Sequence, residues 1–228
     1  MKENSFVTNV PKMKTEEGNY ILYPFSPPIF QTEVDQSFIN DLLNEGKKLT
    51  IEKSDWRERL AGNMKYGGSF IFNDDFILKC QPYLLNYVQD FFNHLIENFG
   101  SKDVDTLLHK QVGRRKKTIG SLELDTMWIN YQSKHDYNPP HTHTGALSFV
   151  IYCKVPENIF NEQAVSNCKD AGKVIFSYGE GTKLRGFDFN VSPYETLMLI
   201  FPSDLKHSVP PFWIDEERIS VSGNFVVV

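Results

Sequence analysis

The spacing of hydrophobic and polar positions changes near the middle of the chain. In its first half, apolar residues recur at intervals of three or four from Val34 to Leu49 and again from Asp75 to Gly100. This spacing gathers apolar side chains on one face of an α-helix. The stretch from Thr50 to Ser69 holds three glycines and scattered charges, which predicts a loop. An aromatic run from Tyr20 to Phe30, interrupted by prolines, predicts an edge strand and an extended link.

Beyond Thr118 the apolar period becomes two, and β-branched and aromatic residues dominate, as expected for strands with one buried face. The predicted strands are Leu122–Tyr131, Ala146–Val155, Lys173–Tyr178, Gly186–Val191, Thr196–Phe201 and Arg218–Val228. Helices followed by strands predict an α+β, mainly β fold, with the N-terminal helices on one face of antiparallel sheets. This order permits a double-stranded β-helix, or jelly-roll. We expect a single domain over 1–228, with supporting elements in 1–118 and the jelly-roll core in 119–228.

Composition and charge exclude several classes of function. The chain has 228 residues, 40% of them hydrophobic, and a net charge of −5, so it has no global attraction for nucleic acids or anionic membranes. A basic cluster from Arg114 to Lys117 lacks interleaved aromatic residues, which disfavours stacking on bases. The chain contains no apolar stretch of about twenty residues, so the sequence predicts no membrane span. Three widely spaced cysteines and a polar N-terminus predict a cytoplasmic protein with reduced thiols. A homodimer is compatible with these data.

Three histidines carry the first candidate chemistry. His141 and His143 follow an Asn-Pro-Pro sequence, and alternate residues of a strand share a face, so both imidazoles could point at one metal ion. His207, after a Phe-Pro-Ser-Asp sequence, could complete the site from a neighbouring strand. A surface turn is the plainer explanation of each histidine. The proline-stiffened entry into an apolar strand favours the metal site, because ligands need preorganisation.

A second pair of residues indicates an acid-binding site. Arg218 and Ser220 stand two apart in an apolar run, so guanidinium and hydroxyl face the same way. Arginine offers a rigid fork of donors to a carboxylate, and the serine adds one more. Asn130, on a predicted strand that leads toward the histidines, is a further candidate for contact with cosubstrate or substrate. His135 is a candidate for the rim of the site.

The order of these motifs resembles the iron(II) and 2-oxoglutarate dependent oxygenases, specifically the short oxygenases common in phages and marine bacteria. The resemblance runs from Leu60-Ala61-Gly62-Asn63 through Trp128-Ile129-Asn130, His141-Thr142-His143, Leu147-Ser148 and Tyr152 to Phe201-Pro202, His207 and Arg218-Ile219-Ser220. It implies a jelly-roll fold, iron(II) on His141, His143 and His207, and 2-oxoglutarate held at its distal carboxylate by Arg218 and Ser220. Molecular oxygen would be the second cosubstrate, and hydroxylation of an unidentified primary substrate the outcome.

The sequence departs from the superfamily at one metal position. The usual triad is two histidines and a carboxylate, whereas His143 stands where the carboxylate is expected. If His143 were the first ligand, the vacant position would fall on Gly145, as in halogenases of this superfamily, and Asp136 is another candidate carboxylate. Two other functions stay open: a cupin-like three-histidine metal enzyme that does not use 2-oxoglutarate, and a non-catalytic metal-binding or structural barrel.

Overall fold

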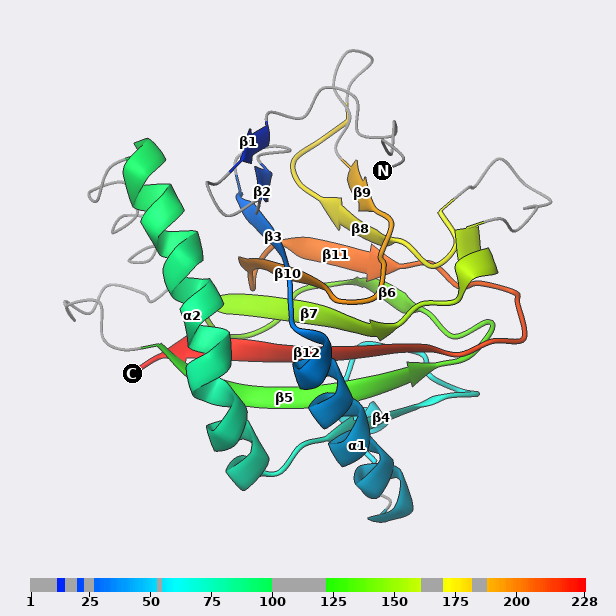
Figure 1. The fold of residues 1–228 in the computed structure, drawn as a ribbon. Coiled ribbons are helices and arrows are strands. Elements are labelled where there is room, and N and C mark those ends of the chain that lie inside the picture. The colour runs from blue at the N-terminus through cyan, green and yellow to red at the C-terminus, as the bar shows by residue number, and fades with distance from the viewer. Residues whose placement is uncertain are drawn as a thin grey trace.

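Two antiparallel sheets form the body of the protein (Figure 1). The computed structural model describes residues 12–14, 20–22, 27–52, 55–99, 122–160, 170–181 and 188–228. The larger sheet has the strand order β1 (Lys12–Lys14), β2 (Tyr20–Leu22), β3 (Ile29–Glu33), β10 (Leu197–Pro202), β7 (Leu147–Lys154), β12 (Arg218–Val227), β5 (Leu122–Gln132) and β4 (Gly68–Ile71). The smaller sheet has the order β6 (Asn138–His141), β11 (Lys206–Val209), β8 (Val174–Ser177) and β9 (Asp188–Val191).

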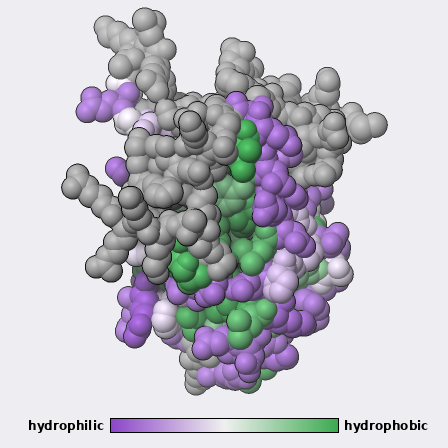
Figure 2. Space-filling model, turned by 90° about the vertical axis from the view of Figure 1, so that its left-hand side faces the viewer, coloured by the Kyte–Doolittle hydropathy of each residue, from purple (hydrophilic) through white to green (hydrophobic). Residues whose placement is uncertain are grey.

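Two helices, α1 (Gln36–Glu52) and α2 (Asp74–Phe99), cover the outer face of the larger sheet (Figure 1). Two short 3-10 helices, η1 (Arg57–Arg59) and η2 (Glu157–Phe160), lie in the connections. The apolar stripes of the helices pack in one core cluster with the sheet residues Ile129, Val221 and Phe225. On the side toward which α2 lies, apolar side chains alternate with hydrophilic ones on the surface (Figure 2). No helix in the described ranges is long and apolar enough to cross a membrane.

Strand alternation sorts the side chains of β5 and β12 onto two faces. Ile129 and Val221 face the helices, while their neighbours Asn130 and Ser220 line a pocket on the opposite face, between the sheets. The two strands pair so that Arg218 lies opposite Gln132 and Ser220 opposite Asn130. A second apolar cluster, which includes Phe176 and Leu199, fills the interior between the sheets. Polar groups are therefore collected at one end of an otherwise apolar interior.

The predicted mainly β fold with supporting helices is confirmed, and each of the six predicted strands corresponds to a strand of the structure. The first residues of the strand predicted from Gly186 lie outside the described ranges, as do Cys168 and the Arg114–Lys117 cluster. The predicted bounds of the loop from Thr50 to Ser69 were wrong at both ends, because α1 continues to Glu52 and β4 begins at Gly68. Cys80 and Cys153 are free and buried, as reduced thiols would be.

Several short strands escaped prediction, among them β6 and β11, which carry site residues. Both β6 and β11 have four residues, too few for a period of two to stand out. The prolines in β6 further mask it as a loop, although proline is tolerated on an edge strand. β6 is the edge strand of the smaller sheet.

Candidate metal and cosubstrate site

The three predicted histidines meet in the structure. His141 ends β6 and lies opposite His207 on β11, and His143 follows two residues beyond the strand. One ligand atom from each residue lies within 4.8 Å of the other two. The ring centroids are 4.3 to 5.0 Å apart. Within the described ranges, no other trio of histidine, cysteine or acidic residues is close enough to hold a metal ion.

Backbone carbonyls set which ring nitrogen of two histidines is free. His141 Nδ1 lies 2.7 Å from the carbonyl oxygen of Pro139, and His207 Nδ1 lies 3.0 Å from that of Leu205. A carbonyl oxygen can only accept, so each Nδ1 carries the proton and each Nε2 keeps its lone pair. Metal-ligating histidines are usually oriented by such a bond from the second nitrogen. The pair is therefore preset as Nε2 donors.

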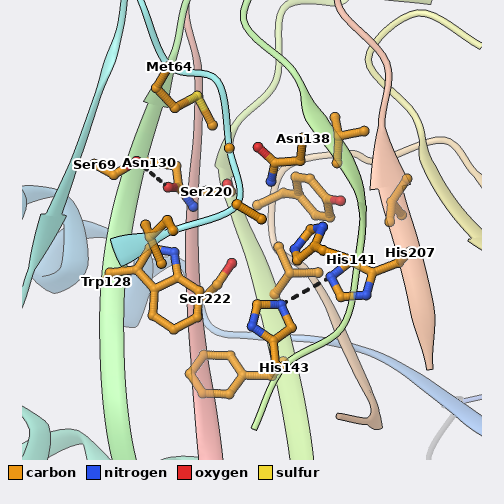
Figure 3. A pocket seen from close by; sticks show the side chains of 18 of the residues that line it. Met64, Ser69, Trp128, Asn130, Asn138, His141, His143, His207, Ser220 and Ser222 are labelled. Atoms are coloured by element: carbon orange, nitrogen blue, oxygen red, sulfur yellow. Dashed lines mark hydrogen bonds between the residues drawn. The ribbon is translucent and has the colours of Figure 1, made fainter. Parts of the chain in front are cut away.

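The spacing of the histidine nitrogens fits a metal ion between them. His143 Nε2 lies 3.1 Å from His207 Nε2 (Figure 3). Two nitrogen ligands about 2.1 Å from one ion and at right angles to each other would be about 3.0 Å apart. A facial triad, which leaves coordination positions open for cosubstrate and oxygen, requires such right angles. The spacing of His143 and His207 fits the metal ion that the sequence resemblance implies.

Burial keeps these imidazoles neutral. Desolvation, reinforced by the neighbouring His141 ring, lowers the pKa of His143 to about 4. Desolvation, with smaller contributions from His141 and His143, lowers the pKa of His207 to about 3. Burial also lowers the pKa of His141. A neutral imidazole is the ligand form of histidine, so at neutral pH the cluster needs no proton release before it can coordinate a metal.

Asp136 does not take the missing carboxylate position. Its side chain is fully buried, and its two oxygens accept hydrogen bonds from the backbone N–H groups of Tyr66, Gly67 and Ser133. It is absent from the histidine group. A structural role accounts for these bonds, and the substitute-ligand interpretation loses its support.

Gly145 also has a structural explanation. Its φ of +102° favours glycine, and a Cβ there would lie 2.7 Å from the carbonyl oxygen of Phe225. A vacant ligand position is not needed to account for a glycine at this site. His141, His143 and His207 all reach the cluster, which favours the sequence register that starts at His141.

Arg218 lies at the other end of the same pocket, and no acidic group in the part of the chain that the structure describes compensates its charge. Its side chain is 4% exposed. One terminal nitrogen donates to the carbonyl oxygen of Gly172 and the other to Oε1 of Gln132, while Nε has no hydrogen-bond partner. Burial lowers the pKa of the guanidinium, and the electrostatic effect of Tyr152 offsets part of this decrease. Within the described ranges, no carboxylate forms an ion pair with Arg218.

Further polar groups line the same pocket. Ser220 lines it beside Arg218, and the ring of Tyr152, 5.7 Å from the guanidinium carbon, lines it as well. Ser69 Oγ donates to Oδ1 of Asn130 at 2.7 Å, which leaves the amide nitrogen of Asn130 as its available group (Figure 3). The structure thus brings together all six predicted site residues around one pocket.

The prediction missed part of the pocket wall. Asn138 has a buried Oδ1 without a partner, and Met64 and Trp128 also line the cavity (Figure 3). Tyr152 belongs to the sequence resemblance but was not predicted as a site residue, although alternation with the apolar positions of β7 could have placed it inside. His135 is exposed and contacts the rings of Tyr66 and Trp213, apart from the three-histidine cluster.

Comparison with known proteins agrees with this geometry. Residues 126–224 match the family model described as "Putative 2OG-Fe(II) oxygenase". This segment contains β5 from Thr126 onward, the three histidines, Arg218 and Ser220. Among curated proteins, no sequence matches the chain.

Solved structures show the same fold. A prolyl-4-hydroxylase from Pseudomonas putida is similar with a TM-score of 0.54 and 14% identity, over 88% of this chain and 92% of that one. A viral collagen prolyl hydroxylase from Paramecium bursaria Chlorella virus-1 gives a TM-score of 0.47 and 12% identity, over 88% and 96% of the two chains. The first comparison supports the jelly-roll core and, at this identity, shows the fold alone.

Over residues 126–224, which hold the site, the chain matches the iron(II) and 2-oxoglutarate dependent oxygenases, and it shares its fold with the prolyl-4-hydroxylase. The predicted cofactors, iron(II) and 2-oxoglutarate, are those of the matched family, and the three-histidine group could hold the metal.

Proposed function

We propose that this enzyme couples the oxidative decarboxylation of 2-oxoglutarate, to succinate and carbon dioxide, to the hydroxylation of an unidentified primary substrate. In this proposal His141, His143 and His207 hold iron(II). Arg218 and Ser220 hold the distal carboxylate of 2-oxoglutarate, and Asn130 contacts the cosubstrate. The observation that carries the assignment is the buried, uncompensated Arg218 at one end of a pocket whose other end is the three-histidine cluster.

The electrostatics of Arg218 support an anionic ligand. A buried cation without a counter-charge is costly, and the cost falls when an anion enters with hydrogen bonds to it. Nε of Arg218 is buried and unpartnered, so a carboxylate could accept from it while the two terminal nitrogens keep their present acceptors. Ser220 offers a hydroxyl on the same face of β12. A dicarboxylic acid that chelates the metal at one end would bring such a carboxylate to this place.

The three-histidine set also favours a dianionic cosubstrate. Three neutral ligands leave the full charge of a divalent ion uncancelled, whereas a carboxylate ligand would remove one unit, and the charge of an ion dominates the field of its site. When bound, iron(II) and 2-oxoglutarate would activate molecular oxygen, one atom of which would enter succinate as 2-oxoglutarate is oxidised and the other a C–H bond of the substrate. The chain's own residues provide three neutral ligands, two of them with a fixed tautomer, a positive anchor, and an apolar interior that excludes water.

An anaerobic titration tests the proposal. Iron(II) and then 2-oxoglutarate are added to the protein while the weak visible charge-transfer band of the chelate is followed. We expect the band to appear with saturable dependence on 2-oxoglutarate, and succinate to form once oxygen is admitted. Iron binding without a band would instead favour the three-histidine enzyme that does not use 2-oxoglutarate. Failure to bind iron would favour a non-catalytic barrel.

A further inference from the structure

One hydrogen-bond chain leads from Arg218 to the opposite wall of the pocket. Arg218 donates to Oε1 of Gln132, and Nε2 of Gln132 donates to the carbonyl oxygen of Asp136 at 2.6 Å. The carboxylate of Asp136 then accepts from the backbone N–H groups of Tyr66 at 3.0 Å and Gly67 at 2.7 Å. Every side chain in this chain of contacts is buried: Arg218 at 4%, Gln132 at 2% and Asp136 at 0% exposed.

The far end of this chain is a segment that lines the pocket. We call residues 60–67 the pocket loop, because Leu60, Ala61, Gly62 and Met64 all contribute to the pocket wall. Figure 3 shows Met64 facing the cavity from the side opposite the histidines. The loop therefore borders the space left for a primary substrate, whereas Arg218 lies where the cosubstrate would end.

Asp136 fits an anchoring role better than a catalytic one. A carboxylate that is fully buried must have its charge satisfied by donors, and three backbone N–H groups do so here. A second contact fastens the same loop, since Asn63 and Tyr137 exchange backbone hydrogen bonds. The anchor also depends on Gly67: a Cβ at that position would overlap the carbonyl oxygen of Tyr131 at 1.7 Å and approach Asp136 at 2.8 Å.

We propose that Gln132 and Asp136 are positioning residues that couple occupation of Arg218 by the cosubstrate to the placement of the pocket loop. This inference rests on the proposed binding of 2-oxoglutarate at Arg218. Gln132 holds Arg218 through its carbonyl oxygen and Asp136 through its amide nitrogen, so a displacement of the guanidinium toward a bound carboxylate is transmitted to both. Buried hydrogen-bonded groups cannot shift independently without leaving a polar atom unpaired.

The coupling has a direct consequence for binding affinity. Cosubstrate at Arg218 would fix the pocket loop in the position that receives the primary substrate, and linkage requires the substrate-filled loop to raise cosubstrate affinity in return. Each of the two ligands would then bind more tightly in the presence of the other.

Hydrogen exchange measured by mass spectrometry tests the coupling, on anaerobic iron(II) protein with and without saturating 2-oxoglutarate. In the wild type we expect 2-oxoglutarate to slow exchange in peptides covering 60–68 by about tenfold, within the usual range of coupling between sites. Gln132→Met keeps the side-chain volume and leaves the hydrogen bonds between the Asp136 carboxylate and the loop amides in place. It removes the two hydrogen bonds that join Gln132 to Arg218 and to Asp136, which we call the relay. It should bind 2-oxoglutarate at saturation and show no slowing.

Two further variants complete the experiment. Asp136→Asn replaces one of the two carboxylate oxygens that accept hydrogen bonds from the loop amides. Backbone amides of residues 60–68 in this variant should therefore exchange rapidly whether or not 2-oxoglutarate is present. This variant keeps the test decisive if Gln132→Met does not fold. Gln81→Met is the matched control: Oε1 of Gln81 likewise accepts a hydrogen bond, here from the backbone N–H of Leu124 at 2.9 Å, but Gln81 lies outside the relay. It should respond to 2-oxoglutarate as the wild type does.

The outcomes separate the relay from the function on which it rests. Slowing in Gln132→Met equal to that of the wild type would overturn the relay, as would a wild type that binds 2-oxoglutarate without any slowing. In both cases the proposed oxygenase function would stand. A wild type that binds iron(II) but no 2-oxoglutarate would overturn both proposals.

Discussion

The two ends of the pocket are built in opposite ways. At the histidine end, neighbouring backbone carbonyls already accept the Nδ1 protons of His141 and His207, and burial keeps the rings neutral. At the arginine end, Arg218 is buried with a permanent charge, an unpartnered Nε and, within the described ranges, no ion-pair partner. The histidine end is complete before its ligand arrives, whereas the arginine end is completed by its ligand. Substitutions at the two ends should therefore have different effects on iron(II) binding and on 2-oxoglutarate binding.

The largest expected effect is the loss of iron binding on removal of a histidine. His207→Ala should weaken iron(II) binding by at least a hundredfold, because it leaves two protein ligands in a site whose metal affinity depends on three. Anaerobic equilibrium dialysis measures the loss. His135→Ala is the matched control, since His135 is exposed and outside the cluster. Equal affinities in the two variants would remove His207 from the metal site.

Arg218→Met should weaken 2-oxoglutarate binding and leave iron(II) binding intact. Iron(II) affinity should stay within about twofold of wild type, while the dissociation constant of 2-oxoglutarate rises by about tenfold to a hundredfold, the worth of a hydrogen bond to a charged group. A monocarboxylic 2-oxo acid such as 2-oxobutyrate chelates the metal but lacks the distal carboxylate. It should bind wild type and Arg218→Met about equally, and parallel losses of both acids would contradict the assignment.

The metal-free protein should lose stability in acid mainly through its histidine end. The folded pKa of His143, about 4, lies below its ordinary value of 6.5. As the pH falls, the unfolded chain therefore binds the extra proton first. The contribution of His143 to folding stability is complete above pH 6.5 and is lost as the pH falls toward 4. Between pH 7 and pH 5 we expect this residue to lower the free energy of unfolding by about 2 kcal/mol.

Urea unfolding at pH 7 and pH 5 measures this contribution. The free energy of unfolding of His143→Ala should fall less over this interval than that of the wild type. Arg218 stays charged throughout the interval, so Arg218→Met should show the wild-type pH dependence. Identical slopes for the wild type and His143→Ala would contradict the neutral-cluster interpretation.

The smallest expected effect belongs to Ser220→Ala. One hydroxyl donor to the distal carboxylate is worth about 1 kcal/mol, so the dissociation constant of 2-oxoglutarate should rise by about fivefold with iron binding unchanged. Isothermal titration under anaerobic conditions is sufficient to resolve the difference. Ser222→Ala, a neighbouring serine that also lines the pocket on β12, is the control. A larger loss in Ser222→Ala than in Ser220→Ala would reverse the two roles.

The sequence predicted most of the site because the site follows strand alternation. Asn130, Arg218 and Ser220 lie on long strands, where a period of two tells which residues share a face. Apolar neighbours on the other face, such as Ile129 and Val221, made that period visible.

The parts that escaped prediction depend on contacts between distant segments. The pocket loop reaches the site only because Asp136, some seventy positions later, binds the amides of Tyr66 and Gly67. No local pattern encodes such a pairing, and the carboxylate of Asp136 suggested a metal ligand instead. His143 lies beyond the end of β6, so the meeting of the three histidines comes from the turn after His141 as much as from the strand.

The central claim is that the buried charge of Arg218 is completed by the distal carboxylate of 2-oxoglutarate. A crystal structure of the protein grown anaerobically with iron(II) and 2-oxoglutarate tests it most directly. We predict one iron bound to His141, His143 and His207, chelation by the 2-oxo acid end, and the distal carboxylate within hydrogen-bond distance of Arg218 Nε and Ser220 Oγ. A chelated 2-oxoglutarate whose distal carboxylate points away from Arg218, toward the pocket loop or solvent, would contradict the account.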